Sequence, residues 1–389
     1  MAAVYDAIVV GAGINGSSTA HYLQKNGYRT LLLEQFPLPH SRGSSHGQSR
    51  ITRKAYFQEI FAEMMKEAYP MWAQLERDSE TQLYKKSQLL VMSTPQSSYM
   101  DTVKRVLIDK KMTFKDVPAD RLLKEFNIKV PAGSKALIEP EGGILRADQA
   151  LMTFQNQFKK LGGKIIDGTP VLSVEPGEII KLHTTKGMFQ SRNVVLCQGS
   201  WAKIFFNQLG IDFPLKPMKI SVGYFKSKVP GQYELKNNFP AFYYGNGIDE
   251  FYGLPAEEYP GMLKLFLHHG PEIDPNKRDQ VDSRYTIEKC EQLVKDIFPG
   301  LELHPSIIET CIYTVIKTFG FCLMTPDEQF VLDRHPKFPN LILGAGFSGH
   351  GFKLAPVTGK ILGEMVMNKR PSYDMSHFRL DRFSRKSLL

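Results

Sequence analysis

The first 34 residues contain two short apolar runs separated by a glycine-rich break and an amphipathic segment. Residues 5–10 predict a buried strand, residues 14–26 have the spacing of a helix that ends before Gly27, and residues 30–34 predict a second strand. A strand, a helix and a strand within about 30 residues are typical of a βαβ unit. The pattern therefore predicts a parallel α/β unit at the N-terminus.

Apolar spacing predicts further elements along the whole chain. We expect helices at residues 56–78, 147–161, 282–297 and 354–367, two helices within 98–128, and strands within 82–93 and at 164–166, 194–197, 262–269 and 341–343. The segment 216–273 is strand-like and rich in aromatic residues, and a second glycine-rich turn follows residue 343. If the two glycine turns meet in space, one α/β domain contains both ends of the chain, and the middle of the chain supplies an antiparallel-sheet domain.

We place boundaries on these two domains from the same pattern. The α/β domain is expected to comprise residues 1–85, 145–215 and 321–389, and the antiparallel-sheet domain residues 86–144 and 216–320.

Composition and charge narrow the class of protein. The chain has 389 residues, of which 42% are hydrophobic and 23% charged, as in ordinary globular proteins of two or three domains. No run of about 18 apolar residues predicts a membrane span, no secretory signal is visible, and four unpaired cysteines favour a reducing compartment. No cysteine or histidine cluster has metal-ligand spacing. The net charge of +9 suits anionic ligands, but the basic residues are scattered, which argues against nucleic acid.

The N-terminal glycine turn carries the strongest motif in the chain. Gly11, Gly13 and Gly16 form a G-x-G-x-x-G pattern between the predicted strand and helix, and Glu34 ends the next strand. In such a motif the glycines permit a tight turn, close approach to a pyrophosphate and helix–sheet packing, and the acidic residue accepts hydrogen bonds from a ribose. The context predicts a dinucleotide site, with a plain glycine turn in a sheet as the alternative.

The segment after Glu34 favours a flavin over a nicotinamide. The chain leaves the regular βαβ pattern and enters a long polar loop from Pro37 to Arg53, which suits a cofactor with an extended body. Within it, Gly43 to Gly47 also reads G-x-S-x-G, the pattern of a hydrolase nucleophile elbow. That interpretation requires a strand directly before the motif, and Pro37 and Pro39 argue against one.

Four segments, in order along the chain, resemble the sarcosine oxidase family of amine oxidases, which carry covalently bound FAD. They are GSSHGQSRITR at 43–53, KLFLHHG at 264–270, CIYT at 311–314 with TPDEQF at 325–330, and GAGFSGHGFK at 344–353. The resemblance covers nearly the whole chain. It implies a fold of the glycine/D-amino acid oxidase type, with a Rossmann-like FAD-binding domain and an antiparallel-sheet substrate domain.

The resemblance also implies roles for individual residues. It places Arg50, Lys264 and His268 at the catalytic centre, Arg53, Lys353 and Tyr252 at the substrate, and His46, Ser49, Cys311, Gly346 and Gly349 at the flavin, beside Gly11, Gly13, Gly16 and Glu34. On the sequence alone several of these have ordinary alternatives: a solvated basic loop for the arginines, a core histidine, an aromatic core residue and a buried thiol. Lys264 is the exception, because a lysine on the apolar face of a strand needs a partner or a function.

One segment departs from the family pattern. Residues 316–324 intervene between the cysteine motif and Thr325, and they add a second cysteine, Cys322. We expect Cys311 to be the flavin-linked thiol, because Ile-Tyr-Thr follows it directly, and Cys322 is the alternative. The insert raises the further hypothesis of a non-catalytic flavin-binding form.

The resemblance implies oxidation of a small secondary amino acid, sarcosine or L-pipecolate. Hydride passes to the flavin, the imine is hydrolysed, and O2 is reduced to hydrogen peroxide. A flavin dehydrogenase with another electron acceptor is the alternative. We expect a monomer that binds neither nucleic acid nor membranes. The family and the peroxide product favour the peroxisome and its import receptor, although the C-terminal Ser387-Leu388-Leu389 lacks the basic middle residue of S-K-L; otherwise the protein is expected in the cytoplasm.

Overall fold

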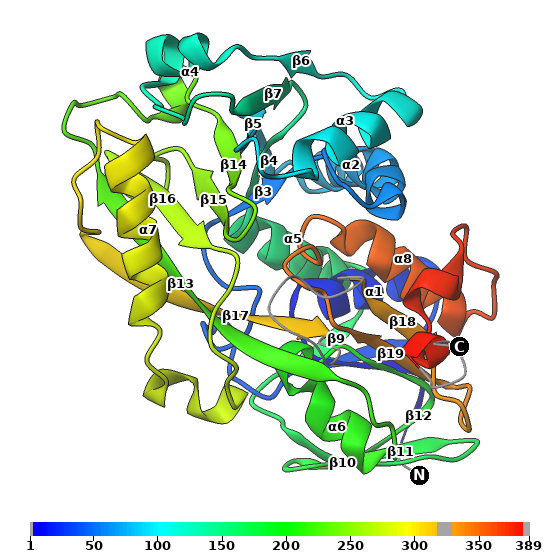
Figure 1. Ribbon diagram of the computed structural model, residues 1–389. Coiled ribbons are helices and arrows are strands. Elements are labelled where there is room, and N and C mark those ends of the chain that lie inside the picture. Colours follow the sequence, from blue (N-terminus) through cyan, green and yellow to red (C-terminus); the bar gives the residue numbers. More distant parts are fainter. Residues whose placement is uncertain (1–2, 317–328, 384–389) are drawn as a thin grey trace.

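A computed structural model describes residues 3–316 and 329–383 of the chain. Its strands form two eight-stranded sheets and one three-stranded sheet (Figure 1). The first sheet has the order β10-β11-β12-β1-β2-β9, with β19 beside β12 and β18 beside β19. Its strands are β1 (Val4–Val10), β2 (Thr30–Leu33), β9 (Lys164–Ile166), β10 (Val171–Glu175), β11 (Ile180–Thr184), β12 (Gly187–Leu196), β18 (Val331–Arg334) and β19 (Leu341–Ala345).

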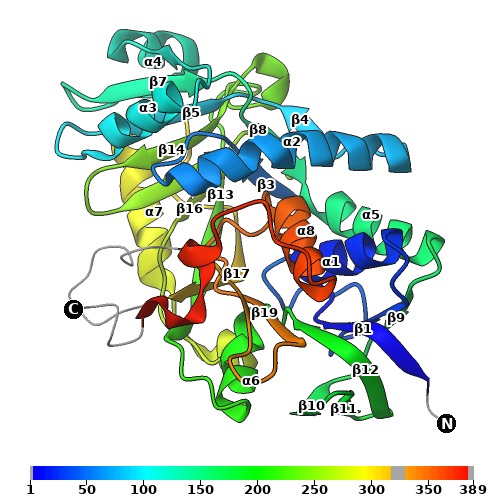
Figure 2. The ribbon, with the colours of Figure 1, turned by 90° about the vertical axis from the view of Figure 1, so that its right-hand side faces the viewer.

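The two ends of the chain meet in this first sheet, as the pattern of glycine turns predicts. β1 and β19 both pair in parallel with β12. Helix α1 (Ile14–Lys25) packs against α8 (Ala355–Val366), and a Cβ on Gly359 would lie 2.4 Å from Ser18 Oγ, so the contact depends on a residue without a side chain. Helix α5 (Ala147–Lys160) lies beside α1 (Figure 2). Helices therefore cover this sheet, which explains why β1 and β2 are almost entirely apolar.

The second eight-stranded sheet is mostly antiparallel. Its order is β17-β13-β16-β15-β14-β5-β7-β6. The strands are β5 (Leu89–Ser93), β6 (Lys115–Asp116), β7 (Lys135–Glu139), β13 (Leu215–Lys226), β14 (Ala241–Gly245), β15 (Glu250–Leu254), β16 (Met262–Leu267) and β17 (Ile307–Ile316). The sheet is antiparallel, as predicted, except that β14 pairs in parallel with β5. These two strands are separated by about 150 residues of chain, so no hairpin constrains their direction.

The remaining elements connect the two large sheets. A small sheet joins β3 (Ser49–Thr52), β8 (Gly143–Arg146) and β4 (Tyr84–Lys86). The other α-helices are α2 (Glu59–Ser79), α3 (Tyr99–Asp109), α4 (Ala119–Phe126), α6 (Ala202–Gln208) and α7 (Arg284–Ile297). Short 3-10 helices span Gly199–Trp201, Leu235–Asn237, Pro275–Gln280, Met375–Phe378 and Leu380–Phe383.

Several predicted boundaries differ from the structure, and two of them concern residues near the site. Helix α2 begins at Glu59 rather than at residue 56, because Tyr56 and Phe57 pack inward from the loop before it. Strand β16 ends at Leu267, so His268 lies one residue beyond the strand that we expected to carry it. Its backbone N–H still donates to the carbonyl of Glu250. The domain boundaries given above remain a prediction.

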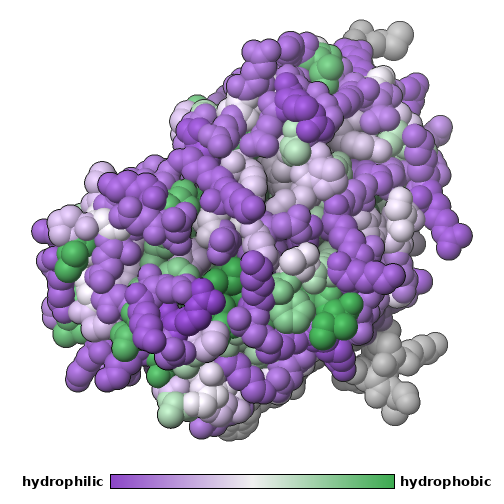
Figure 3. Space-filling model, turned by 90° about the horizontal axis from the view of Figure 1, so that it is seen from above, coloured by the Kyte–Doolittle hydropathy of each residue, from purple (hydrophilic) through white to green (hydrophobic). Residues whose placement is uncertain are grey.

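The surface seen from above is largely hydrophilic, with hydrophobic residues in small, separate groups (Figure 3). Within residues 3–316 and 329–383, no helix combines the length and the apolar character needed to span a bilayer.

Candidate functional site

The glycine turn between β1 and α1 is built so tightly that side chains are excluded from it. A Cβ on Gly11, whose φ is +102°, would lie 2.4 Å from the carbonyl oxygen of Cys197, and a Cβ on Gly16 would lie 1.9 Å from the carbonyl oxygen of Gly11. Gly13 faces Ser45, whose hydroxyl accepts a hydrogen bond from the N–H of Ile14. The turn thus brings free backbone and the N-terminus of α1 to the edge of a cavity.

Glu34 lies directly after β2 and is 6% exposed. One of its carboxylate oxygens accepts the N–H of Ala12 at 2.8 Å, and the other accepts the N–H of Phe36 at 3.1 Å and lies 3.4 Å from His40 Nε2. The carboxylate is therefore fixed beside the glycine turn, next to the cavity that the turn borders.

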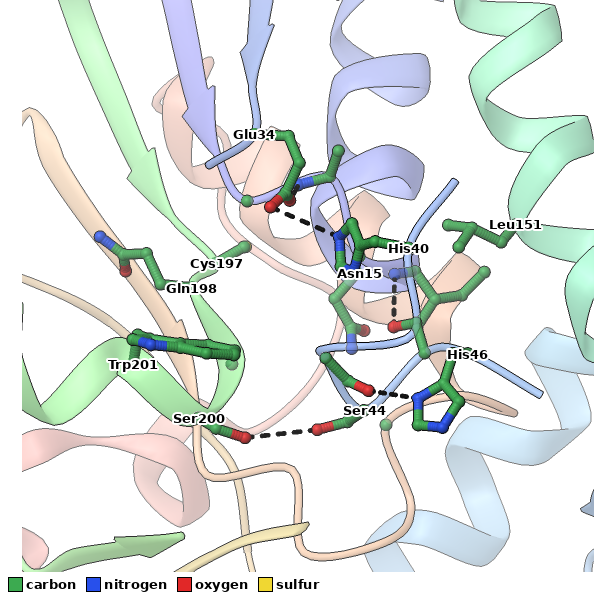
Figure 4. Close-up of a pocket in the computed structure, with 18 of the residues that line it drawn as sticks. Asn15, Glu34, His40, Ser44, His46, Leu151, Cys197, Gln198, Ser200 and Trp201 are labelled. Atoms are coloured by element: carbon green, nitrogen blue, oxygen red, sulfur yellow. Dashed lines mark hydrogen bonds and ion pairs between the residues drawn. The ribbon is translucent and has the colours of Figure 1, made fainter. Parts of the chain in front are cut away.

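A cavity of about 330 Å³ extends along this turn. Gln198 and Trp201 face Asn15, His40 and Leu151 across it (Figure 4). From Glu34 it continues past the loop at 43–47 to Tyr313 and to residues 347–352. Gly16 and Gly346 support the surrounding turns without lining the cavity, whereas Gly11, Gly13 and Gly349 line it. The glycine turn, the helix N-terminus and the fixed carboxylate fit the pyrophosphate and ribose of an FAD.

The loop that follows Glu34 is held by its own side chains. Arg50 donates to the carbonyl oxygens of Ser44, His46 and Ser49. His46 contacts the Gly43 carbonyl at 2.6 Å and the Thr310 carbonyl at 3.0 Å, which ties the loop to β17, and burial lowers the pKa of this histidine. Because Arg50 and His46 both line the cavity as well, the loop is rigid where it meets the expected flavin.

A second cavity of about 70 Å³ adjoins the first. Both cavities are lined by His46, Gly47, Arg50, Tyr313, Gly349 and Phe352. The second one lies over one face of the large sheet, to which alternate residues of β13, β15, β16 and β17 contribute. The sheet therefore positions side chains directly beside the expected flavin position.

Two cations in the second cavity have no carboxylate within ion-pair distance in the described part of the chain, although Glu139 and Glu250 act on Arg53 from farther away. Arg53 is 1% exposed, and its guanidinium donates to the hydroxyl groups of Tyr99 at 2.9 Å and Tyr252 at 3.1 Å and to the carbonyl of Ala55. Lys353 is 7% exposed, and its pKa is lowered well below the ordinary value by burial and by the nearby arginines. A buried positive charge without a counter-ion is costly, so these residues predict an anionic ligand.

Lys264 meets its charge requirement differently. Its ammonium lies 2.6 Å from Glu258 Oε1 and 3.3 Å from Ser49 Oγ, and the Ser49 hydroxyl donates to the same carboxylate. Burial lowers the pKa of Lys264, although Glu258 opposes that effect. Burial would raise the pKa of Glu258, but Lys264 and the hydroxyl groups of Ser49 and Tyr224 together outweigh it, so we assign the pair as ammonium and carboxylate.

His268 is a neutral imidazole. Burial, Lys353 and Arg53 lower its pKa to about 3, and its Nδ1 has no hydrogen-bond partner among the residues that the structure describes. Its ring lies against Gly349, where an added Cβ would be 2.6 Å from His268 Cε1. Tyr252 packs on the ring with 5.0 Å between the centroids. His268 can therefore offer a hydrogen bond to a bound ligand without adding charge.

Cys311 is on β17 and lines the second cavity. Burial raises the pKa of its thiol, while Arg50, Lys264 and Arg278 lower it. The positive surroundings that attachment chemistry needs are thus present, although burial outweighs them here. Cys322 and most of the insert lie outside the described residues. Cys197 and Cys290, the other two described cysteines, are buried, and no cluster of metal-ligating side chains occurs in the described ranges.

The structure brings the residues named from the sequence together around two adjoining cavities, but it also adds residues that the sequence did not reveal. Glu258 lies in a segment whose sequence resembles a polar turn, and Glu309 lies on a strand with no unusual pattern. Glu139 accepts the N–H groups of Lys54 and Ala55 and thereby fixes the backbone beside Arg53. No local pattern indicates these carboxylates, because their partners are distant in sequence.

Comparisons with known proteins agree with this geometry. The model of the FAD dependent oxidoreductase family matches residues 6–365. The peroxisomal sarcosine oxidase of Homo sapiens is 43% identical over 385 residues, which cover 98% of this chain and 96% of the relative. That of Mus musculus is 44% identical over 388 residues, with the same coverage. Among solved structures, NikD, an unusual amino acid oxidase essential for nikkomycin biosynthesis, superposes with a TM-score of 0.82 at 21% identity, covering 97% of both chains.

Proposed function

Because the chain belongs to the sarcosine oxidases within the FAD dependent oxidoreductase family, we propose that it oxidises small secondary amino acids. The enzyme is an FAD-dependent oxidoreductase. We assign sarcosine as the leading substrate and L-pipecolate as the next, with O2 as the electron acceptor and hydrogen peroxide as the product. The observation that carries the choice of substrate class is the pair of buried cations, Arg53 and Lys353, in a small cavity beside the expected flavin position.

The charge of that cavity supports an amino acid carboxylate as the bound anion. The Arg53 guanidinium is oriented by Tyr99, Tyr252 and Ala55. Lys353 approaches from the opposite end of the chain, on the turn before α8. A carboxylate between them would supply the negative charge that the described residues lack. The volume of about 70 Å³ favours a small substrate over a bulky one.

Bound FAD supplies the two-electron acceptor for this reaction. The protein's own residues bind and orient the substrate. Arg53 and Lys353 would hold the carboxylate, and neutral His268 would offer its imidazole to the amine side without repelling it. Tyr252 and Phe266 close the cavity over β15 and β16. Lys264 would present a fixed positive charge where O2 is reduced.

The proposed reaction is tested in two steps. Sarcosine or L-pipecolate is mixed with the purified yellow protein without oxygen, and the flavin absorbance is followed. Bleaching supports the proposed substrate class, and its absence with both substrates would refute it. Admission of air then distinguishes an oxidase, which forms stoichiometric hydrogen peroxide, from a dehydrogenase, which does not.

We also propose that FAD is attached covalently through Cys311. The cysteine lies beside the loop at 43–50 and faces the second cavity, with Arg50 and Lys264 near its thiol. The alternative, Cys322, lies outside the described residues. Acid precipitation separates bound from released flavin, and peptide mass spectrometry identifies the modified cysteine. Modification at Cys322 alone would overturn the assignment.

For the cell, we propose a monomer in the peroxisome. The human and mouse relatives are named peroxisomal enzymes. The C-terminal Ser387-Leu388-Leu389, proposed to contact an import receptor, lies outside the described residues. Microscopy of the full chain with and without its last three residues tests the location, and light scattering tests the monomer.

A further inference from the structure

Lys264 is connected to the protein surface by an unbroken series of hydrogen bonds. Its ammonium donates to Glu258, and the second oxygen of Glu258 accepts from the Tyr224 hydroxyl at 2.7 Å. The same hydroxyl lies 3.0 Å from Glu309, whose other oxygen accepts from the Tyr259 hydroxyl at 2.7 Å. Three side chains thus link a buried lysine to Tyr259, which lies in a turn between the exposed residues Glu257 and Pro260.

The fold holds this series in place. Tyr224 on β13 is paired in register with Lys264 on β16, and Glu309 on β17 is paired with Val222, two residues before Tyr224. The Tyr224 and Tyr259 rings pack edge to face, with 4.7 Å between their centroids. Tyr224 is fully buried. Tyr224 and Glu309 therefore have fixed neighbours on paired strands, and the ring contact ties Tyr259 of the turn between β15 and β16 to them.

We propose that Glu258, Tyr224, Glu309 and Tyr259 form a proton path from solvent to Lys264. The inference rests on the proposed function, because an oxidase must deliver protons to the place where it reduces O2. Two electrons, taken from the amine through the flavin, and two protons convert O2 to hydrogen peroxide. The hydride removed from the substrate contains both electrons and one of the two protons. The path supplies the second proton through Lys264.

The chemistry of each member allows it to receive one proton and release another. A phenol has one proton, so Tyr224 gives its proton to the Glu258 carboxylate as it receives another through Glu309. Shifting one proton at every step moves a proton from water at Tyr259 to Lys264, and the hydroxyl and carboxyl groups then reorient before the next transfer. Arg50 and Cys311 are the other ionisable groups that act on Lys264, and neither belongs to the path.

The path predicts how fast Lys264 exchanges its protons with water in the resting holoenzyme, without substrate. Lysine labelled with ¹⁵N at Nζ reports this rate by NMR, and the signal is assigned by its loss in Lys264→Met. Tyr224→Phe removes the hydroxyl that joins the two carboxylates and is expected to slow the exchange by at least roughly tenfold. Tyr233→Phe is the matched control, because Tyr233 is equally buried but bonds to Asn127 in another core.

Glu309→Gln provides a second break in the path in case Tyr224→Phe does not fold. Glutamine keeps a hydrogen bond but cannot relay a proton, so the same slowing is expected. Exchange in either folded variant within about twofold of the wild type would overturn the path. Anaerobic bleaching of the wild-type protein by sarcosine is measured separately. Its absence would refute the proposed function and leave the exchange result intact.

Discussion

Replacement of Lys353 by methionine is expected to weaken ligand binding and stabilise the protein at once. Lys353 is 7% exposed, and no acidic side chain in the described part of the chain lies within ion-pair distance of it. Methionine has a similar length and no charge. The substitution therefore removes a costly buried cation from the free protein and a carboxylate ligand from the complex.

The two effects have different sizes. Loss of one partner of a buried charge pair costs about 2–5 kcal/mol, and about 3 kcal/mol corresponds to a roughly 100-fold loss of affinity. Replacement of a buried ion by an apolar side chain gains about 1–4 kcal/mol of stability. An unfolding entropy of about 2.1 cal/mol/K per residue over 389 residues gives about 0.8 kcal/mol/K. A gain of about 2 kcal/mol therefore raises Tm by about 2–3 °C.

Titration with acetate, a carboxylate that cannot be oxidised, measures the affinity through the flavin absorbance, and thermal unfolding measures the stability. Lys360→Met is the control, because Lys360 lies on α8 outside both cavities and is paired with Glu67 at 2.6 Å. It should leave the acetate affinity unchanged. Wild-type acetate affinity in Lys353→Met would show that Lys353 is not a carboxylate ligand. A clear loss of stability would show that its charge is compensated in the free protein.

Three further outcomes follow from the site. Gly16→Ala places a Cβ 1.9 Å from the Gly11 carbonyl oxygen, so the purified protein should contain little FAD by absorbance; full occupancy would contradict this. Burial raises the pKa of Glu139 from 4.5 to about 7, so wild-type stability should fall by about 3 kcal/mol as the pH rises from about 4.5 to 7. Chemical denaturation of Glu139→Gln should lack that loss. Cys311→Ser should release its flavin on acid precipitation, whereas Cys290→Ser should retain it; the reverse would exclude Cys311.

Much of the fold could be predicted because its elements are encoded locally. The βαβ unit and α8 have strong periodicity, and both glycine turns follow apolar strands. What local patterns could not supply is pairing between distant segments. β5 pairs in parallel with β14, and β3, β4 and β8 form a small sheet. These pairings depend on tertiary packing, because the sequence of a short strand specifies neither its partner nor its direction.

In the candidate site, the ionic partners of buried charged residues could not be predicted from local patterns either. Lys264 attracted attention as a lysine on an apolar face, and the need for a partner was predictable. The partner itself was not, because Glu258 lies in the turn Ala256–Gly261, which resembles a solvated loop. The sequence also placed His268 inside a strand, although β16 ends before it. Burial decides the role of such residues, and burial depends on which strands meet.

The contrast between the cations of the second cavity determines how a substrate can lie in it. Lys264 is already neutralised by Glu258 at 2.6 Å, so it has little attraction left for a carboxylate. Arg53 and Lys353 have no carboxylate within ion-pair distance among the described residues, and both lower the pKa of the neighbouring His268. An amino acid therefore gains most by placing its carboxylate at Arg53 and Lys353. The same orientation leaves Lys264 free of the substrate, which the role proposed for it at O2 requires.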